Sequence, residues 1–262
     1  MIFKVDEWFE WDFNLPPLLE QCKIAEVLGV WDESIDLLER LIGKTRSRKQ
    51  GLMQQLLTGK KRFKEFTSLI DNGEWLNLPI GKICHSIVPG RNKPKQFNGD
   101  IPWITTPSIT QKYISKNNTN LFISEEEIKE CRGKKVPQGS VIINCVGDFG
   151  IIGIAQQEMV INQQLHAFVC PEGLNNEYIY YALSIQTHHM LKVATTTTIP
   201  YMNKSSCESI PILLPSLPEQ EKIAAVLSAA DEEISTLEKQ LAAYKQQKLG
   251  LMQQLLTGRI RI

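Results

Sequence analysis

The sequence lacks a long uninterrupted hydrophobic run and any surplus of charge of one sign. Its apolar runs are too short, or too often broken by charge, to span a bilayer, so no membrane segment is predicted. Lys and Arg together number 29, as do Asp and Glu, so the net charge is zero. Binding to nucleic acid therefore needs a local basic surface rather than bulk positive charge. The first residues show no signal-peptide pattern, which favours a cytoplasmic protein.

Catalytic and metal-binding motifs are also missing. The six cysteines show no Cys-x-x-Cys spacing and the four histidines no metal-ligand spacing, so no metal site is predicted and the cysteines are expected to be reduced thiols. Gly43-Lys44-Thr45 resembles the end of a phosphate loop, but Leu38 stands where its first glycine belongs. Neither a dinucleotide-binding glycine motif nor the Asn-Pro-Pro-Tyr motif of an amino-methyltransferase is present. The sequence predicts no catalytic centre and no cofactor bound by this chain.

One stretch occurs twice: Gly-Leu-Met-Gln-Gln-Leu-Leu-Thr-Gly ends both segment 15–59 and segment 214–258. The two segments align without a gap at a constant shift of 199 residues, with 25 of 45 positions identical. A match of this length indicates two related units that bracket one unique middle region. The sequence therefore divides into an N-terminal extension (1–14), a first helix region (15–60), a middle domain (61–213) and a second helix region (214–262).

Apolar residues in both helix regions follow the alternating three- and four-residue steps of a heptad. The predicted seam consists of Ile24, Leu28, Trp31, Ile35 and Leu38 in the first region and Ile223, Leu227, Ile234 and Leu237 in the second. Lys49 and Lys248 occupy matching seam positions, where each ammonium is expected to reach water or a carboxylate. Ser216 and Glu219 form a capping-box pattern at the start of the second helix.

Charge predicts how the two helices pair. Each is acidic in its first half and basic in its second, so antiparallel pairing sets each acidic half beside a basic half. A basic run, 60–64, follows the first helix. It is suited either to contacting phosphates or to offsetting the negative end of the helix.

The middle region mixes short strand and helix patterns. Strands are expected within 78–84, 101–106, 136–146, 150–155 and 167–171, and helices over 124–130 and from 176 to about 192. This pattern predicts one α/β domain. With the two long helices in an antiparallel coiled coil, the expected fold class is α+β.

Polar loops of this domain are the candidate DNA contacts, since Arg and Lys suit guanine and phosphates while Asn and Gln suit adenine edges. The main candidates form one loop: Arg91, Asn92, Lys93, Lys95 and Gln96. Further candidates are Lys112, Lys134, Thr197, Asn203 and Lys204. The alternative is that these are ordinary solvated loops.

The helix motifs resemble a known family. Leu-Pro-x-Leu-x-Glu-Gln-x-Lys-Ile-Ala, followed by Leu-Met-Gln-Gln-Leu-Leu-Thr-Gly, closely resembles the conserved regions of Type I restriction–modification specificity (S) subunits. The middle is similar to that family's target recognition domain at Gly99-Asp-Ile-Pro-Trp-Ile, Asn162-Gln-Gln and Thr198-Ile-Pro-Tyr-Met-Asn-Lys.

The resemblance implies a non-catalytic subunit that reads one half of a bipartite, interrupted site in double-stranded DNA. It implies partners: methyltransferase (M) subunits, which bind S-adenosylmethionine, and restriction (R) subunits where the system cleaves DNA. A full specificity subunit has two recognition domains, whereas this sequence carries one. That leaves a homodimer, which is preferred, or a second half-subunit on another chain. The rival from another class is a coiled-coil scaffold protein that reads no DNA sequence.

Overall fold

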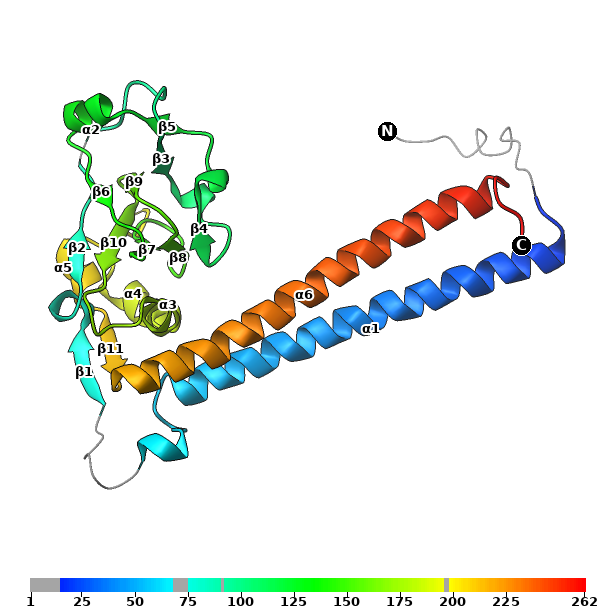
Figure 1. Ribbon diagram of the computed structural model, residues 1–262, viewed down its shortest axis with the longest axis horizontal. Coiled ribbons are helices and arrows are strands. Elements are labelled where there is room, and N and C mark those ends of the chain that lie inside the picture. The colour runs from blue at the N-terminus through cyan, green and yellow to red at the C-terminus, as the bar shows by residue number, and fades with distance from the viewer. Residues whose placement is uncertain (1–14, 68–74, 91, 196–197) are drawn as a thin grey trace. The chain divides into compact units, whose positions relative to one another are not determined.

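The computed structural model describes residues 15–67, 75–90, 92–195 and 198–262 (Figure 1). Two compact units divide the chain. A helical unit holds the described residues up to Lys49 together with Ala229–Ile262, and a globular unit holds Gln50–Ser228. In the described part of the chain, no helix combines the length and apolar character that a membrane span requires.

There are two long helices, α1 (Leu18–Leu56) and α6 (Leu217–Leu256), each about 60 Å long at a rise of 1.5 Å per residue. The part of α1 up to Lys49 and the part of α6 from Ala229 belong to the helical unit. The seven predicted seam residues that lie in this unit are buried or half-buried, and Ile24 is 6% exposed, whereas Ile223 and Leu227 are buried in the core of the globular unit. Trp31 and Tyr244 meet edge to face, with ring centroids 5.5 Å apart. The two helices lie side by side (Figure 1), which confirms the predicted α+β class with a helical pair.

Ion pairs show that α1 and α6 run in opposite directions. As the residue number rises on α1 it falls on α6 and the residues that follow α6, through the pairs Glu20–Arg261, Asp32–Lys248, Glu39–Lys245, Arg46–Glu238 and Lys49–Asp231. Lys49 and Lys248 each reach a carboxylate, as the heptad pattern predicted. Because exposed pairs contribute roughly 0–1 kcal/mol each, they specify orientation and register more than stability.

The internal repeat relates these pairs to one another. A shift of 199 residues exchanges Lys49 with Lys248 and Asp32 with Asp231, so the two lysine–aspartate pairs are the same contact made twice. In the same way, Arg46–Glu238 corresponds to Lys245–Glu39. The two helices are therefore related by an approximate two-fold axis.

The first turn of α6 carries a buried acid in the globular unit. The side chain of Glu219 is fully buried, and its Oε1 accepts a hydrogen bond from Arg62 Nε at 3.0 Å. Its Oε2 accepts from Arg62 Nη2 at 2.7 Å and from Trp75 Nε1 at 3.1 Å. Burying a carboxylate requires a cation and full hydrogen bonding, which explains why Glu219 binds Arg62 in place of the predicted capping box. The hydrogen bond to Glu219 raises the pKa of Arg62, and this arginine of the basic run is thus an internal anchor.

Three sheets build the globular unit. Strands β1 (Leu76–Pro79) and β11 (Pro211–Leu214) pair antiparallel. A five-stranded sheet has the order β2 (His85–Ile87), β10 (Leu165–Val169), β7 (Val141–Asn144), β8 (Ile152–Ala155) and β4 (Tyr113–Ile114). A four-stranded sheet has the order β5 (Phe122–Ile123), β3 (Ile101–Ile104), β9 (Met159–Ile161) and β6 (Lys135–Val136).

Short helices complete the unit: α2 (Glu125–Cys131), α3 (Asn176–Ser184), α4 (Thr187–Val193) and α5 (Lys204–Glu208). Single 3-10 turns occur at Lys64–Phe66, Ile80–Lys82, Thr106–Ser108 and Lys116–Asn118. Strands β7 and β8 are buried throughout, and α3 packs on both. This arrangement explains why residues 141–143 of β7 and all of β8 lack charged and polar side chains.

The single helix predicted from 176 to about 192 is wrong, because it is two helices, α3 and α4. The Gln186 N–H donates to the Leu183 carbonyl in a tight turn, and the backbone of Gln186 leaves the helical region. The change of direction allows α4 to place Met190, which is fully buried, in the core formed by β7, β8 and α3.

Candidate nucleic-acid interface

The loop proposed from the sequence as the main DNA contact is held by its backbone and leaves its side chains in water. Gln163 Nε2 donates to the carbonyls of Gly90 at 3.1 Å and Asn92 at 2.9 Å. The Lys95 N–H donates to Glu127 Oε1 at 2.6 Å. Asn92, Lys93, Lys95 and Gln96 are all exposed, whereas Arg91 lies outside the described residues. A fixed backbone with exposed polar side chains is suited to contacting a ligand.

The same loop packs against the end of α2. A Cβ on Gly90 would lie 2.4 Å from the Arg132 carbonyl oxygen, so only glycine permits this approach. Arg132 itself adopts the left-handed conformation that ends α2, with φ 54°. Lys134 follows two residues later and is exposed. The structure therefore brings Lys134 to the region of the 92–96 loop.

A polar turn at 162–164 joins this loop to the next segment. The Gln164 N–H donates to Asn162 Oδ1 at 3.1 Å, and Asn162 Nδ2 donates to Gln164 Oε1 at 3.2 Å. Thr106 Oγ1 reaches both Gln164 Oε1 at 3.4 Å and Asn144 Oδ1 at 3.0 Å. Sequence reasoning did not select Thr106, Asn144 or Gln164 as contacts, because only the pairing of strands distant in sequence brings them together.

Asn144 extends these contacts to the loop after residue 197. Its Nδ2 donates to the carbonyls of Val146 at 2.8 Å and Asp148 at 2.7 Å. Val146 forms a β-bridge with Tyr201, and the Gly147 N–H donates to the Pro200 carbonyl at 2.9 Å. The loops at 92–96, 105–108, 144–148, 162–164 and 198–203 are thus linked by hydrogen bonds, and we call them the loop edge.

Two candidates sit at the end of the loop edge. Asn203 Oδ1 accepts from the Ser206 N–H at 2.9 Å and caps α5, while Lys204 pairs with Glu208 at 3.6 Å. Both residues are exposed. Thr197 lies outside the described residues.

Lys112 lies apart from the loop edge, in an internal polar cluster. Its Nζ donates to Glu177 at 3.0 Å, to Tyr181 at 3.1 Å and to Ser228 at 2.7 Å, and its side chain is only 12% exposed. Burial acts to raise the pKa of Glu177, but hydrogen bonds from Ser228, Tyr113 and Lys112 outweigh burial and hold that pKa below its ordinary value. We therefore leave Lys112 out of the proposed DNA surface.

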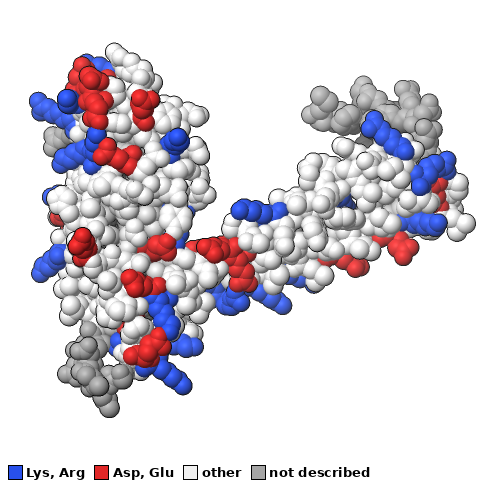
Figure 2. Space-filling view, viewed as in Figure 1, with Lys and Arg blue, Asp and Glu red and all other residues white. Residues whose placement is uncertain are grey.

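Charge on the globular unit is mixed. Figure 2 shows basic and acidic side chains interspersed on the visible face, without one broad basic surface. The loop edge offers amides, hydroxyls and a few ammonium groups. Such a set suits hydrogen bonding to base edges with a small number of phosphate contacts.

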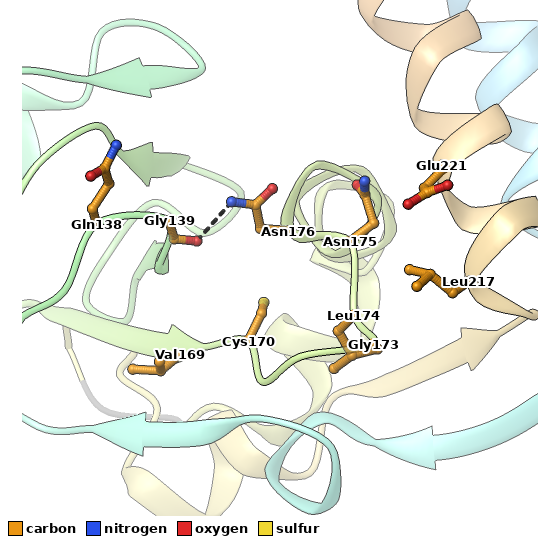
Figure 3. A pocket seen from close by; sticks show the side chains of 10 residues that line it. All are labelled: Gln138, Gly139, Val169, Cys170, Gly173, Leu174, Asn175, Asn176, Leu217 and Glu221. Carbon is orange, nitrogen blue, oxygen red and sulfur yellow. Dashed lines mark hydrogen bonds between the residues drawn. The ribbon is translucent and has the colours of Figure 1, made fainter.

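A separate open pocket of about 440 Å³ lies between the turn at Gln138–Gly139, the loop 173–176 and the first turns of α6 (Figure 3). Asn176 Nδ2 donates to the Gly139 carbonyl across one side, and Leu217 and Glu221 line the other. Its lining includes one carboxylate, that of Glu221, and otherwise amide, apolar, thiol and glycine groups. This composition provides no carboxylate pair for acid–base chemistry.

Comparison with known proteins identifies a family and several relatives of this chain. Residues 72–244 match the family described as the Type I restriction modification DNA specificity domain. The MjaIX specificity subunit of Methanocaldococcus jannaschii, a Type I restriction enzyme subunit, is 30% identical over 166 residues, covering 62% of this chain and 38% of that protein. The MjaVIII specificity subunit of the same organism is 25% identical over 269 residues, covering 95% of this chain and 62% of that protein. This chain thus spans 38% to 62% of the length of these relatives.

Solved structures share the fold. The HsdS subunit of Thermoanaerobacter tengcongensis superposes with a TM-score of 0.58 at 19% identity, covering 94% of this chain and 60% of that one. The S subunit of a Type I restriction–modification system from M. genitalium gives a TM-score of 0.60 at 16% identity, covering 91% and 61%.

Proposed function

This chain belongs to the Type I restriction–modification DNA specificity family, and from that premise we propose that it is the subunit that recognises the DNA sequence. In this proposal it reads one half of a bipartite, interrupted site. Methylation is performed by methyltransferase subunits, which bind S-adenosylmethionine, and cleavage by restriction subunits where they are present. The chain itself is not the catalyst, and it acts in the cytoplasm, where the DNA is.

The observation that carries the proposal is the loop edge. Five loops distant in sequence are joined by hydrogen bonds between backbone and side chains, while Asn92, Lys93, Gln96 and Asn203 stay exposed. A rigid backbone that presents amide and ammonium groups can discriminate bases, since each bidentate contact to a base is worth about 1–3 kcal/mol. The amides are proposed to contact base edges, and Lys93, Lys95 and Lys134 to contact phosphates.

Mapping of methylated DNA tests this proposal. Cells that express the methyltransferase subunit with this chain are expected to gain methylation at one defined sequence, and cells without the chain to lack it. Exchange of residues 92–96 for glycine and serine is expected to abolish or alter the sequence, while the matched change Lys239→Ala on α6 leaves it intact. Methylation that ignores sequence, or DNA binding that is non-specific at every salt concentration, would instead favour the scaffold function.

The second half of the target requires a second recognition domain, and the helical repeat supports a place for it. Leu57 is 2% exposed in the globular unit, whereas its repeat counterpart Leu256 is 60% exposed in the helical unit. Likewise, the ion pair Glu20–Arg261 is the repeat counterpart of Glu219–Arg62, which anchors α6 in the globular unit. In the counterpart pair, however, the Arg261 side chain is 65% exposed. We propose that a second copy of this chain supplies the recognition domain that covers this end. Sedimentation checks this, because a strict monomer with and without DNA contradicts the homodimer.

The outer face of α1 supports a docking site for a methyltransferase subunit. Val27, Val30, Leu37 and Leu41 are exposed, and at 100° per residue they fall on one face about a third of a turn from the seam. An exposed apolar stripe of this kind is typical of a protein–protein interface.

A further inference from the structure

Three side chains that could bind a metal ion meet inside the globular unit. Cys145 follows β7, His166 lies on the neighbouring strand β10, and Cys207 lies on α5. They are 5%, 2% and 0% exposed. One donor atom from each lies within 4.8 Å of the other two. The sequence predicted no metal site because these residues are far apart along the chain and lack any motif spacing.

An unsatisfied ring nitrogen of His166 is independent evidence that a further group binds at this cluster. Its Nε2 is buried and has no hydrogen-bond partner among the described residues. A buried imidazole nitrogen without a partner costs about 1–3 kcal/mol, so the site is incomplete without a further group. The cysteine pair Cys84 and Cys170, with sulfurs 3.9 Å apart, shows the contrast, since among the described residues no third metal-ligating side chain gathers with it.

We propose that Cys145, His166 and Cys207 bind one zinc-class divalent cation. Two sulfurs and one imidazole nitrogen are the ligands that zinc prefers, at about 2.3 Å for sulfur and 2.0–2.1 Å for nitrogen. A tetrahedral site with these bond lengths separates its ligand atoms by roughly 3.5–3.8 Å, so closing the cluster requires shifts of about 1 Å. On binding, each thiol releases its proton to water. The two thiolates then balance the charge of the cation, the neutral imidazole donates a lone pair, and one neutral water molecule would complete the tetrahedron, so the buried site carries no net charge.

The position of the site explains what the ion does for the fold. The Met202 N–H donates to the Cys145 carbonyl at 2.9 Å, and Asn203 caps the short helix that carries Cys207. A cation bound here ties α5 and the loop before it to the ends of β7 and β10. The site is structural, and the inference does not rest on the proposed DNA recognition.

Metal analysis of the 262-residue chain, purified without chelator, tests the proposal. One zinc per chain is expected, and Co²⁺ added to the chelated protein is expected to produce thiolate-to-cobalt charge-transfer absorption. Cys207→Ser and His166→Asn should abolish that absorption, whereas Cys84→Ser, a buried cysteine of the other pair, should retain it. Cobalt absorption that is absent, or that survives both substitutions, overturns the proposal.

A measurement on the wild-type chain covers the case in which a variant fails to fold. Chelation is expected to accelerate alkylation of Cys145 and Cys207, relative to Cys84 and Cys170, by at least tenfold in native buffer. Mass spectrometry of the digested chain resolves each site. Equal rates with and without chelator would contradict a bound ion.

Discussion

Lysines of the globular unit have two physical roles. Lys112 is enclosed by Glu177, Ser228 and Tyr181, where it balances a partly buried carboxylate. Lys93 is exposed on a loop whose backbone is fixed by Gln163 and Glu127. A substitution at the first position therefore acts on folding, and a substitution at the second acts on binding.

We expect Lys93→Ala to weaken binding to cognate DNA and to leave unfolding unchanged. Removal of one phosphate contact reduces the slope of log affinity against log salt by about one unit. Titration of labelled DNA at several salt concentrations measures this slope. Lys239→Ala, an exposed lysine on α6, serves as the control and should leave the slope unchanged.

Glu177 makes stability depend on acid pH. Its pKa is lower in the folded chain than its ordinary value of 4.5, so its contribution is complete above the unfolded pKa and is lost as pH falls through the folded pKa. Glu177→Gln should lower the free energy of unfolding at neutral pH by about 1–3 kcal/mol, because it leaves Lys112 without its carboxylate. The variant should also lose less stability than wild type on acidification. Urea unfolding between neutral and acid pH checks both, and parallel pH profiles would contradict this assignment.

At the scale of elements, the helices followed from the sequence far better than the loop edge did. The seam of α1 and α6 depends on residues three and four apart, and the sequence displays that spacing directly. Thr106 and Gln164 form their hydrogen bond only because the ends of strands β3, β9 and β10 lie close together in the fold. No local sequence pattern specifies that contact. For the same reason, sequence spacing alone did not group Cys145 with His166 and Cys207.

Two adjacent leucines lie on different faces of α1, so that substitutions can test each face by itself. Leu37→Asp, at a position 63% exposed on the outer stripe, should weaken methyltransferase binding by at least tenfold and leave thermal unfolding unchanged. Leu38→Asp, on the half-buried seam, should destabilise the helix pair by about 2 kcal/mol or more, since it buries a carboxylate. Circular dichroism melting and co-purification with the methyltransferase subunit distinguish the two. Equal effects of both variants on binding would argue against the outer stripe.

At the scale of the whole molecule, the repeat predicts what a dimer depends on. Leu256→Asp places a charge on the end proposed to contact a second copy, so the dissociation constant of the dimer should rise at least tenfold. Leu249→Asp, also exposed but further from the helix end, is the matched control. Analytical ultracentrifugation over a concentration series measures both constants. If the wild-type chain is a dimer and Leu256→Asp leaves its dissociation constant unchanged, this end of the helix pair is not the dimer interface.

The order of synthesis determines when α1 can pair with α6. The last residue of α1 leaves the ribosome about 200 residues before the last residue of α6. At about 5–20 residues per second, α1 waits on the order of 10–40 s for the helix that covers Ile24 and Ile42. Most of that interval is spent on synthesis of the globular unit, which ends at Ser228, while the apolar face of α1 stays uncovered. Of the two long helices, α1 is made first and waits for α6, and nascent α1 is where we expect a chaperone to bind.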